Sequence, residues 1–267
     1  MKRFKNILFV ADKPGTESMA FQNALDLANS NQASMTVLDV IEPVTWSAEN
    51  QARFGADLST MLRDRRCDEL EAMVNPHCKE RLMIHTQVAI GTPFLEIIRA
   101  VQRQQFDLVI KSAERKTGLR PVQLGPNDQH LLRKCPCPVW IDREETQHPY
   151  RKIIAAVDPV GDQDKSMARM ILDLALSVDA SDEAEVHVAH AWHLPMESTL
   201  RASRRTIPER QVDDMLRSQL DIHQNAMRDL LKPYGMTLND PNVHFEKSEP
   251  TPLIARLALD LSADLAV

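Results

Sequence analysis

Short apolar runs separated by longer amphipathic segments occur along the chain in an order that repeats once. The run at 7–12 and the run at 153–158 both end in aspartate. A second apolar run lies at 35–40 in the first half and at 186–191 in the second. Runs of this length predict buried β-strands, and segments with apolar residues every three or four positions predict helices. The pattern therefore predicts two copies of one α/β unit.

The segments between these runs predict matching helices and further strands. Long polar-rich helices with one apolar face are expected at about 49–74 and about 208–232. Each half then has a Thr-Pro pair, which places proline where the first residue of a helix belongs. These pairs are residues 92–93 and 251–252. A third strand is expected before each pair, at 84–88 and 243–245, and a fourth after each helix, at 106–110 and 263–267.

Alternating strands and helices imply right-handed crossovers and a parallel sheet with helices on both faces. The sequence thus predicts an α/β protein of two tandem doubly wound parallel-sheet domains, at 1–145 and 149–267. The first domain continues into a helix around 128–133 and a last strand at 139–141. The second ends at Val267 inside its fourth strand, so we expect this domain to be incomplete and the chain to be C-terminally truncated.

The composition narrows the classes of partner. The chain has 267 residues, a formal net charge of -6 and 26% charged residues, a balance that argues against nucleic acid as its partner. No apolar run approaches the roughly 18 residues of a membrane span, and the N-terminus does not resemble a signal peptide. Four cysteines fit a reducing compartment in which they stay thiols. We therefore expect a cytoplasmic protein.

The repeated opening strand with its terminal aspartate resembles that of the universal stress protein family. Two further stretches, at 107–112 and 131–140, are similar to the first domain of tandem E-type members of that family. The resemblance covers essentially the whole chain as two consecutive domains. It implies an adenine-nucleotide α-hydrolase-like, Rossmann-like fold and a role in the bacterial stress response.

Nucleotide-binding members of that family carry G-x-x-G, nine residues, then G-[S/T] after the fourth strand. Aligned on Gly125, the first two glycines become Ser112 and Arg115, and Pro126 replaces the final hydroxyl residue. Added Cβ atoms and a missing backbone donor impair a phosphate cradle. Lys111 and Arg115 could still attract phosphate by charge, although we expect such side chains to face solvent. We predict that the first domain is mainly structural and binds ATP weakly or not at all.

In the second domain the phosphate pattern would lie after Val267. The resemblance implies a ligand position at Asp158 and another at Ala191, next to the base; the equivalents in the first domain are Asp12 and Val40. An aspartate at the end of a strand can equally cap a helix or turn the chain. The implied cofactor is ATP or another adenine nucleotide in a complete second domain.

Motifs of the common catalytic classes are absent from the sequence, which favours a binding or regulatory module over an enzyme. His187 and His190 lie on opposite faces of their strand, which argues against a metal site. The alternative function is a scaffold without nucleotide that binds an apolar or lipid-like ligand or a protein partner, near 46–61 and 192–208. By resemblance, the two domains are expected to pair by a pseudo-two-fold axis within one chain, and a homodimer is also open.

Overall fold

The structure is a computed structural model that describes residues 4–11, 18–43, 48–78, 82–114, 124–143, 150–161, 165–178, 184–202 and 207–267, with the backbone alone for 48–59. Its internal contacts divide the chain into two compact units, Met1–Thr146 and Gln147–Val267. Each unit is described by itself.

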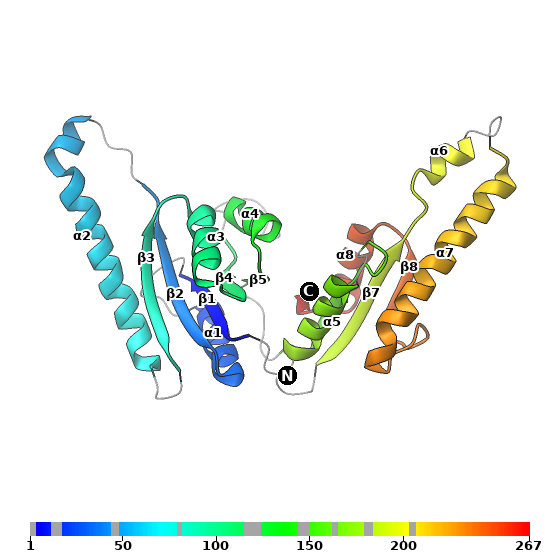
Figure 1. Ribbon diagram of the computed structural model, residues 1–267, viewed down its shortest axis with the longest axis horizontal. Helices are drawn as coiled ribbons and strands as arrows, with labels where there is room; N and C mark the ends of the chain where they lie inside the picture. The colour runs from blue at the N-terminus through cyan, green and yellow to red at the C-terminus, as the bar shows by residue number, and fades with distance from the viewer. Residues whose placement is uncertain are drawn as a thin grey trace. The chain divides into compact units, whose positions relative to one another are not determined.

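Unit 1 alternates strands and helices in the predicted order (Figure 1). Its elements are β1 (Asn6–Val10), α1 (Met19–Asn31), β2 (Ser34–Ile41), α2 (Ala48–Val74), the 3-10 helix η1 (Asn75–His77), β3 (Ile84–Ile90), α3 (Pro93–Gln104), β4 (Leu108–Ser112), α4 (Pro126–Lys134) and β5 (Val139–Asp142). All strand pairs are parallel, in the order β3-β2-β1-β4-β5.

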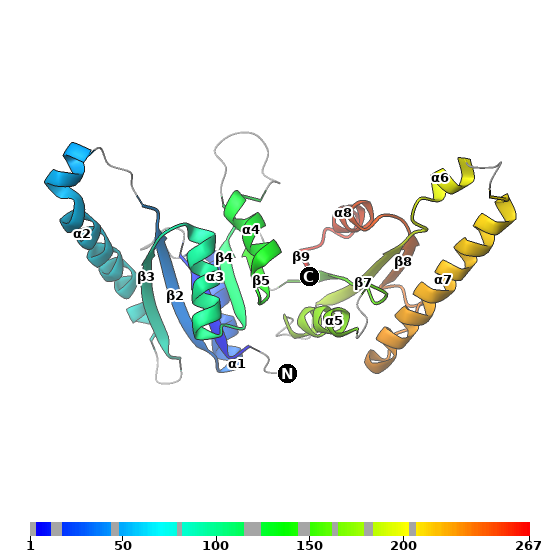
Figure 2. The ribbon, with the colours of Figure 1, turned by 45° about the horizontal axis from the view of Figure 1, so that its top comes forward.

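The sheet of unit 1 is covered on both faces, as the sequence predicts. Figure 2 shows α3 and α4 in front of the sheet and α1 behind it. On the α3 and α4 face, Leu8 and Leu38 pack with Ile97 and Leu131 in one buried cluster. On the opposite face the Phe9 ring lies 5.2 Å from the Phe21 ring of α1. Alternation along each strand thus sends successive apolar side chains into two separate cores.

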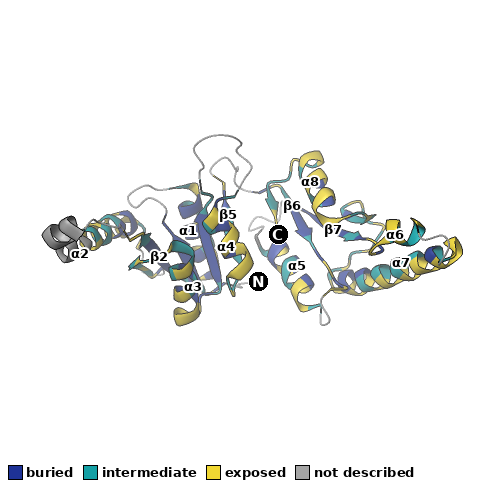
Figure 3. Cartoon of the chain, turned by 90° about the horizontal axis from the view of Figure 1, so that it is seen from above, coloured by how far each residue is buried: buried dark blue, intermediate teal, exposed yellow. Residues whose placement is uncertain are grey.

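Unit 2 has the same arrangement. Its elements are β6 (Lys152–Ala156), α5 (Ser166–Val178), β7 (Glu185–Trp192), α6 (Glu197–Ala202), α7 (Glu209–Leu231), the 3-10 helix η2 (Lys232–Tyr234), β8 (Val243–Lys247), α8 (Pro250–Asp260) and β9 (Leu265–Ala266). The parallel strand order β8-β7-β6-β9 matches that of the first four strands in unit 1. Figure 3 shows α8 on one side of this sheet and α5 and α7 on the other, with buried residues along the strands.

The two units also share details that set their register. In unit 1 the Asp107 carboxylate accepts hydrogen bonds from the backbone N–H groups of Lys5 and Asn6. In unit 2 Asp264 accepts from those of Arg151 and Lys152 at 2.7 and 2.9 Å. Both aspartates tie the start of the fourth strand to the start of the first. The same side-chain bond therefore fixes the central strand pair in each copy.

The prediction of tandem parallel sheets with alternating helices is confirmed. The two long helices begin and end within one residue of the predicted bounds. Three short elements were missed: the 3-10 helices η1 and η2, and α6, a short helix in a region predicted to be a loop. Among the described residues, no helix is both long and apolar enough to cross a membrane.

Candidate functional site

The candidate site in each unit follows from the strand order. In a doubly wound sheet, ligands bind beyond the carboxyl ends of the strands, at the point where the order reverses. That point lies between β1 and β4 in unit 1 and between β6 and β9 in unit 2. The structure places Ser112 and Gly125 at this edge of unit 1, and Asp158 at this edge of unit 2. Asp12 and Arg115 lie outside the described residues.

A buried ion pair occupies the edge of unit 1. Lys111 is 2% exposed and Asp128 is fully buried, and Lys111 Nζ lies 2.5 Å from Asp128 Oδ1. The ammonium also donates to the carbonyl oxygen of Ser112 at 2.8 Å. The other carboxylate oxygen, Oδ2, accepts from the backbone N–H groups of Glu114 at 2.9 Å and Gly125 at 3.2 Å. These bonds compensate both buried charges and fix the two ends of the loop after β4.

A second carboxylate lies at the N-terminus of α4. Glu114 accepts from the backbone N–H of Asn127 at 3.3 Å and from its side-chain amide at 2.6 Å. A Cβ added at Gly125 would overlap the Glu114 carboxylate, so this glycine permits the close approach. Helix N-termini attract anions, and in the family's phosphate loop that anion would be the phosphate. In unit 1 the chain's own acidic side chains take these donors.

Two findings differ from the sequence-based expectations for this edge. We expected Lys111 to face solvent, which is wrong: it lies inside β4, where Asp128 compensates its charge. The roles of Glu114 and Asp128 were also missed. The spacing Gly125-x-x-Asp128 is a signal for the second, because an acid three residues after an N-cap often bonds back to the cap.

The two remaining described residues predicted for the unit 1 site, Ser112 and Val40, make few contacts that bear on ligand binding. The Ser112 hydroxyl lies 3.4 Å from the hydroxyl of Ser18, the N-cap of α1. Val40, near the end of β2, is half-buried and packs against the α3 and α4 core. Neither finding distinguishes a ligand contact from packing, so the ligand role of Val40 and Ser112 stays a prediction.

The edge of unit 2 presents an exposed carboxylate. Asp158 follows β6, and its Oδ1 accepts from the backbone N–H groups of Val160 and Gly161, both at 3.2 Å. Asp158 therefore turns the chain here, which is one of the two roles that the sequence left open. Ala191, near the end of β7, is half-buried against the α8 cluster.

Two histidine pairs lie on opposite faces of the unit 2 sheet, as the alternation along β7 predicts. His187 Nδ1 lies 3.1 Å from His244 Nε2 on the α8 side. On the α7 side, His190 Nε2 lies 2.8 Å from His223 Nδ1. Within the described part of the chain, no three His, Cys, Asp or Glu side chains are placed to hold a metal ion.

The His190 pair supports the candidate loop. His190 Nδ1 lies 2.8 Å from the carbonyl oxygen of Val157, the residue before Asp158. Burial lowers the pKa of His190, and burial together with the His190 ring lowers the pKa of His223. At neutral pH both rings are therefore uncharged, and one donates while the other accepts. The pair joins α7 to the strand end that carries the candidate site.

Unit 1 has an ion pair at the corresponding place. Asp39 on β2 is buried, and Arg66 on α2 places its Nε 3.6 Å from Asp39 Oδ2. Burial raises the pKa of Asp39, and the Arg66 charge opposes that shift. Asp39 and His190 each lie on the second strand of their sheet, and Arg66 and His223 each lie eight residues before the end of the long helix. Each copy thus joins its long helix to its second strand, unit 1 by an ion pair and unit 2 by a hydrogen bond between two histidines.

Comparisons with known proteins agree with this architecture. The family model described as the universal stress protein family matches residues 3–143. Universal stress protein E of Escherichia coli is 26% identical over 286 residues, which cover 100% of this chain and 84% of the relative. The Haemophilus influenzae homolog of that protein is 21% identical over 99% of this chain and 87% of its own. A crystal structure of a protein of unknown function from Pseudomonas aeruginosa PAO1 has a TM-score of 0.66 and 24% identity, covering 99% of this chain and 81% of that one.

Proposed function

Since the chain belongs to the universal stress protein family, we propose that it is a ligand-binding regulatory module whose ligand is held by unit 2. The ligand class is an adenine nucleotide, bound in a complete second domain at the carboxyl edge of the sheet beside Asp158 and Ala191. Unit 1 is a structural partner that binds no nucleotide tightly. The observation that supports these different roles is the contrast between the carboxyl edges of the two sheets: the donors at the unit 1 edge are paired within the chain, and the unit 2 edge has an exposed carboxylate.

In unit 1 the donors that would bind phosphate have intramolecular partners. The backbone N–H of Gly125 bonds to Asp128, and that of Asn127 bonds to Glu114. A nucleotide phosphate would have to displace a carboxylate and would meet its negative charge at short range. Lys111, at the end of the strand that precedes this loop, is already paired and buried. These contacts support the prediction from the altered glycine pattern.

In unit 2 the corresponding edge has an accessible acceptor. Asp158 is exposed, and its described hydrogen bonds use only one of its two carboxylate oxygens. A carboxylate with a free oxygen can accept from a ribose hydroxyl, as acidic residues do in dinucleotide-binding folds. The neighbouring strand end, at Ala191, has no bulky side chain to exclude a flat base.

Two measurements on a purified chain that contains a complete second domain test the proposal. Mass spectrometry of small molecules released on denaturation should detect adenine nucleotide, and ATP titration by calorimetry should give one site per chain. Asp158→Ala should weaken that binding by about tenfold, the equivalent of ~1.4 kcal/mol. The matched control, Asp12→Ala at the equivalent position of unit 1, should leave it unchanged.

Two results would contradict the proposal. Equal losses for both variants would mean that unit 1 binds as well, against the division of labour. Release of acyl chains or another apolar compound, with no heat on adding ATP, would favour the alternative scaffold function.

A further inference from the structure

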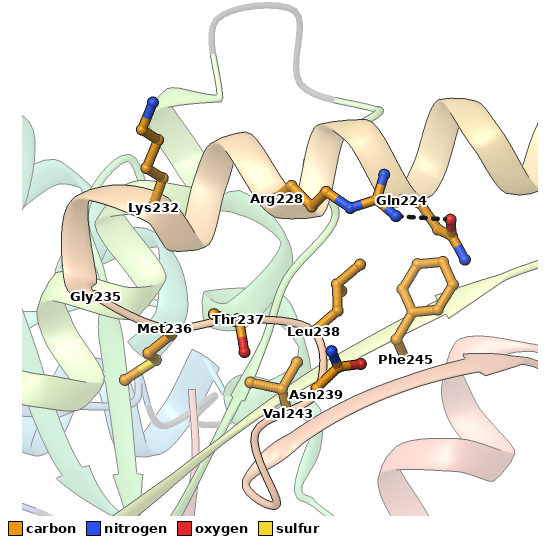
Figure 4. A pocket seen from close by; sticks show the side chains of 10 residues that line it. All are labelled: Gln224, Arg228, Lys232, Gly235, Met236, Thr237, Leu238, Asn239, Val243 and Phe245. Atoms are coloured by element: carbon orange, nitrogen blue, oxygen red, sulfur yellow. Dashed lines mark hydrogen bonds between the residues drawn. The ribbon is translucent and has the colours of Figure 1, made fainter.

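A cavity of about 670 Å³ lies in unit 2, away from the candidate nucleotide site. The last turns of α7, the connection after η2 and the first half of β8 enclose it (Figure 4). Its lining residues are Gln224, Arg228, Lys232, Gly235, Met236, Thr237, Leu238, Asn239, Val243 and Phe245. The volume falls within the roughly 300–1,000 Å³ of small-molecule sites. β8 is an edge strand, separated by β7 from the β6 edge that bears Asp158.

The wall formed by residues 235–239 is fixed by its own hydrogen bonds. Gly235 adopts a positive φ of 68° that ends η2, and the Met236 N–H donates to the carbonyl of Leu231. Asp240 accepts from the Thr237 backbone N–H at 2.8 Å and from its hydroxyl at 2.7 Å. The acidic group nearest this wall thus bonds within its own turn. A wall held in this way does not have to be ordered when a ligand binds.

The lining combines an apolar floor with positive charge. Val243 is buried and Phe245 and Leu238 are half-buried, and Figure 4 shows Leu238 directed toward α7. None of the lining residues is acidic, in a chain whose net charge is -6. The Arg228 guanidinium donates to the amide oxygens of Gln224 at 3.1 Å and Asn225 at 2.9 Å, both neutral partners. Figure 4 shows the Arg228 side chain directed toward Gln224, and Lys232 pointing away from the other lining residues.

Comparison with unit 1 shows which of these lining residues the fold itself requires and which are specific to unit 2. The buried helix residues Leu70, Met73 and Val74 of unit 1 correspond to Met227, Leu230 and Leu231 of unit 2. In this register Arg228 corresponds to Glu71. The strand pairing likewise aligns Phe245, which pairs with His190, to Val88, which pairs with Asp39. The fold is therefore compatible with an acid and a small side chain at these places, and the cation and the aromatic ring are specific to unit 2.

We propose that this cavity binds a small organic anion with an apolar body, which packs on Phe245 and Leu238 and pairs its charge with Arg228. The guanidinium would exchange its neutral partners for the stronger hydrogen bonds of a carboxylate, sulfonate or phosphate. The site is distinct from the nucleotide site and does not involve the segments near 46–61 and 192–208 to which the sequence points for an apolar ligand.

The probe for the test is 8-anilinonaphthalene-1-sulfonate, an aromatic anion whose fluorescence rises in apolar surroundings. Titrated into the folded full chain at pH 7.5, it should give saturable binding at one site. Arg228→Glu should weaken that binding at least about tenfold, the equivalent of ~1.4 kcal/mol. Leu238→Ala, which trims the apolar wall, should weaken it several-fold.

The matched control is Arg217→Glu, the same charge reversal on α7 at a residue outside the lining, whose side chain is 78% exposed. It should bind the probe like the original chain. N-phenyl-1-naphthylamine, which has the same rings without the sulfonate, should bind more weakly. Equal affinity of Arg228→Glu and Arg217→Glu, or of charged and uncharged probe, would overturn the proposal. So would displacement of the probe by ATP, since that would place it at the other site.

Discussion

Asn in place of Asp128 should destabilise unit 1 by about 3 kcal/mol, at the lower end of the cost of breaking a buried ion pair. The estimate follows from burial: Lys111 is 2% exposed, so its ammonium would lose its counter-charge where water cannot replace it. The amide oxygen of Asn still accepts from the backbone N–H groups of Glu114 and Gly125. The substitution therefore keeps the backbone bonds of the loop and removes both the charge and the hydrogen bond that Asp128 accepts from Lys111.

Urea unfolding followed by Trp140 fluorescence measures this effect, because Trp140 on β5 pairs directly with Ile110 on β4, next to Lys111. The double variant Lys111→Met with Asp128→Asn should recover about 2 kcal/mol, since no buried charge remains and methionine fills a similar volume. A single variant within about 0.5 kcal/mol of the original chain would refute the reasoning. So would a double variant no more stable than the single.

Three further predictions follow from other contacts. Burial lowers the pKa of His190 below 6.5, so the unfolded state binds more protons and unit 2 should lose stability as the pH falls below about 6.5. With the other two tryptophans replaced, Trp192 fluorescence should report a slope of up to ~1.4 kcal/mol per pH unit that His190→Gln reduces. The hydrogen bond with Cys137 lowers the pKa of Cys135 to about 7, so its alkylation by iodoacetamide should rise through about pH 7, and Cys137→Ala should move that midpoint upward. Glu114→Ala should free donors at the start of α4, so sulfate should raise the melting temperature of this variant more than that of the original chain.

The parts of the fold that could be predicted are those that depend on the order of apolar and polar residues within a short segment. Apolar runs gave the strands, and the repeat then corroborated each weak assignment with a second copy. The long helices were predicted accurately because their buried residues recur with helical spacing up to Val74 and Leu231. The short helix α6 has no buried residue and no such period, so nothing in its composition distinguished it from a loop.

The candidate edge of unit 1 was only partly predictable. The helix predicted around 128–133 is α4, which spans Pro126–Lys134 and begins directly after Gly125. The alignment of the family's glycine pattern on Gly125 could not show that Lys111 faces inward, since a lysine after an apolar run resembles the solvated end of a strand. Its burial depends on Asp128, seventeen residues away in sequence, and only the folded loop brings the two side chains together.

The duplication gives a stronger guide to function than either copy alone. Both copies face the same packing problem, so a position where they agree reflects the fold, as with the Asp107 and Asp264 links. A position where they differ is free of that constraint. His190 in place of Asp39 replaces an ion pair by a hydrogen-bonded pair of neutral rings, both with pKa values that burial lowers, while keeping the helix joined to the sheet. The structural role is thus retained, and what differs between the copies is how the link to the candidate loop responds to protons.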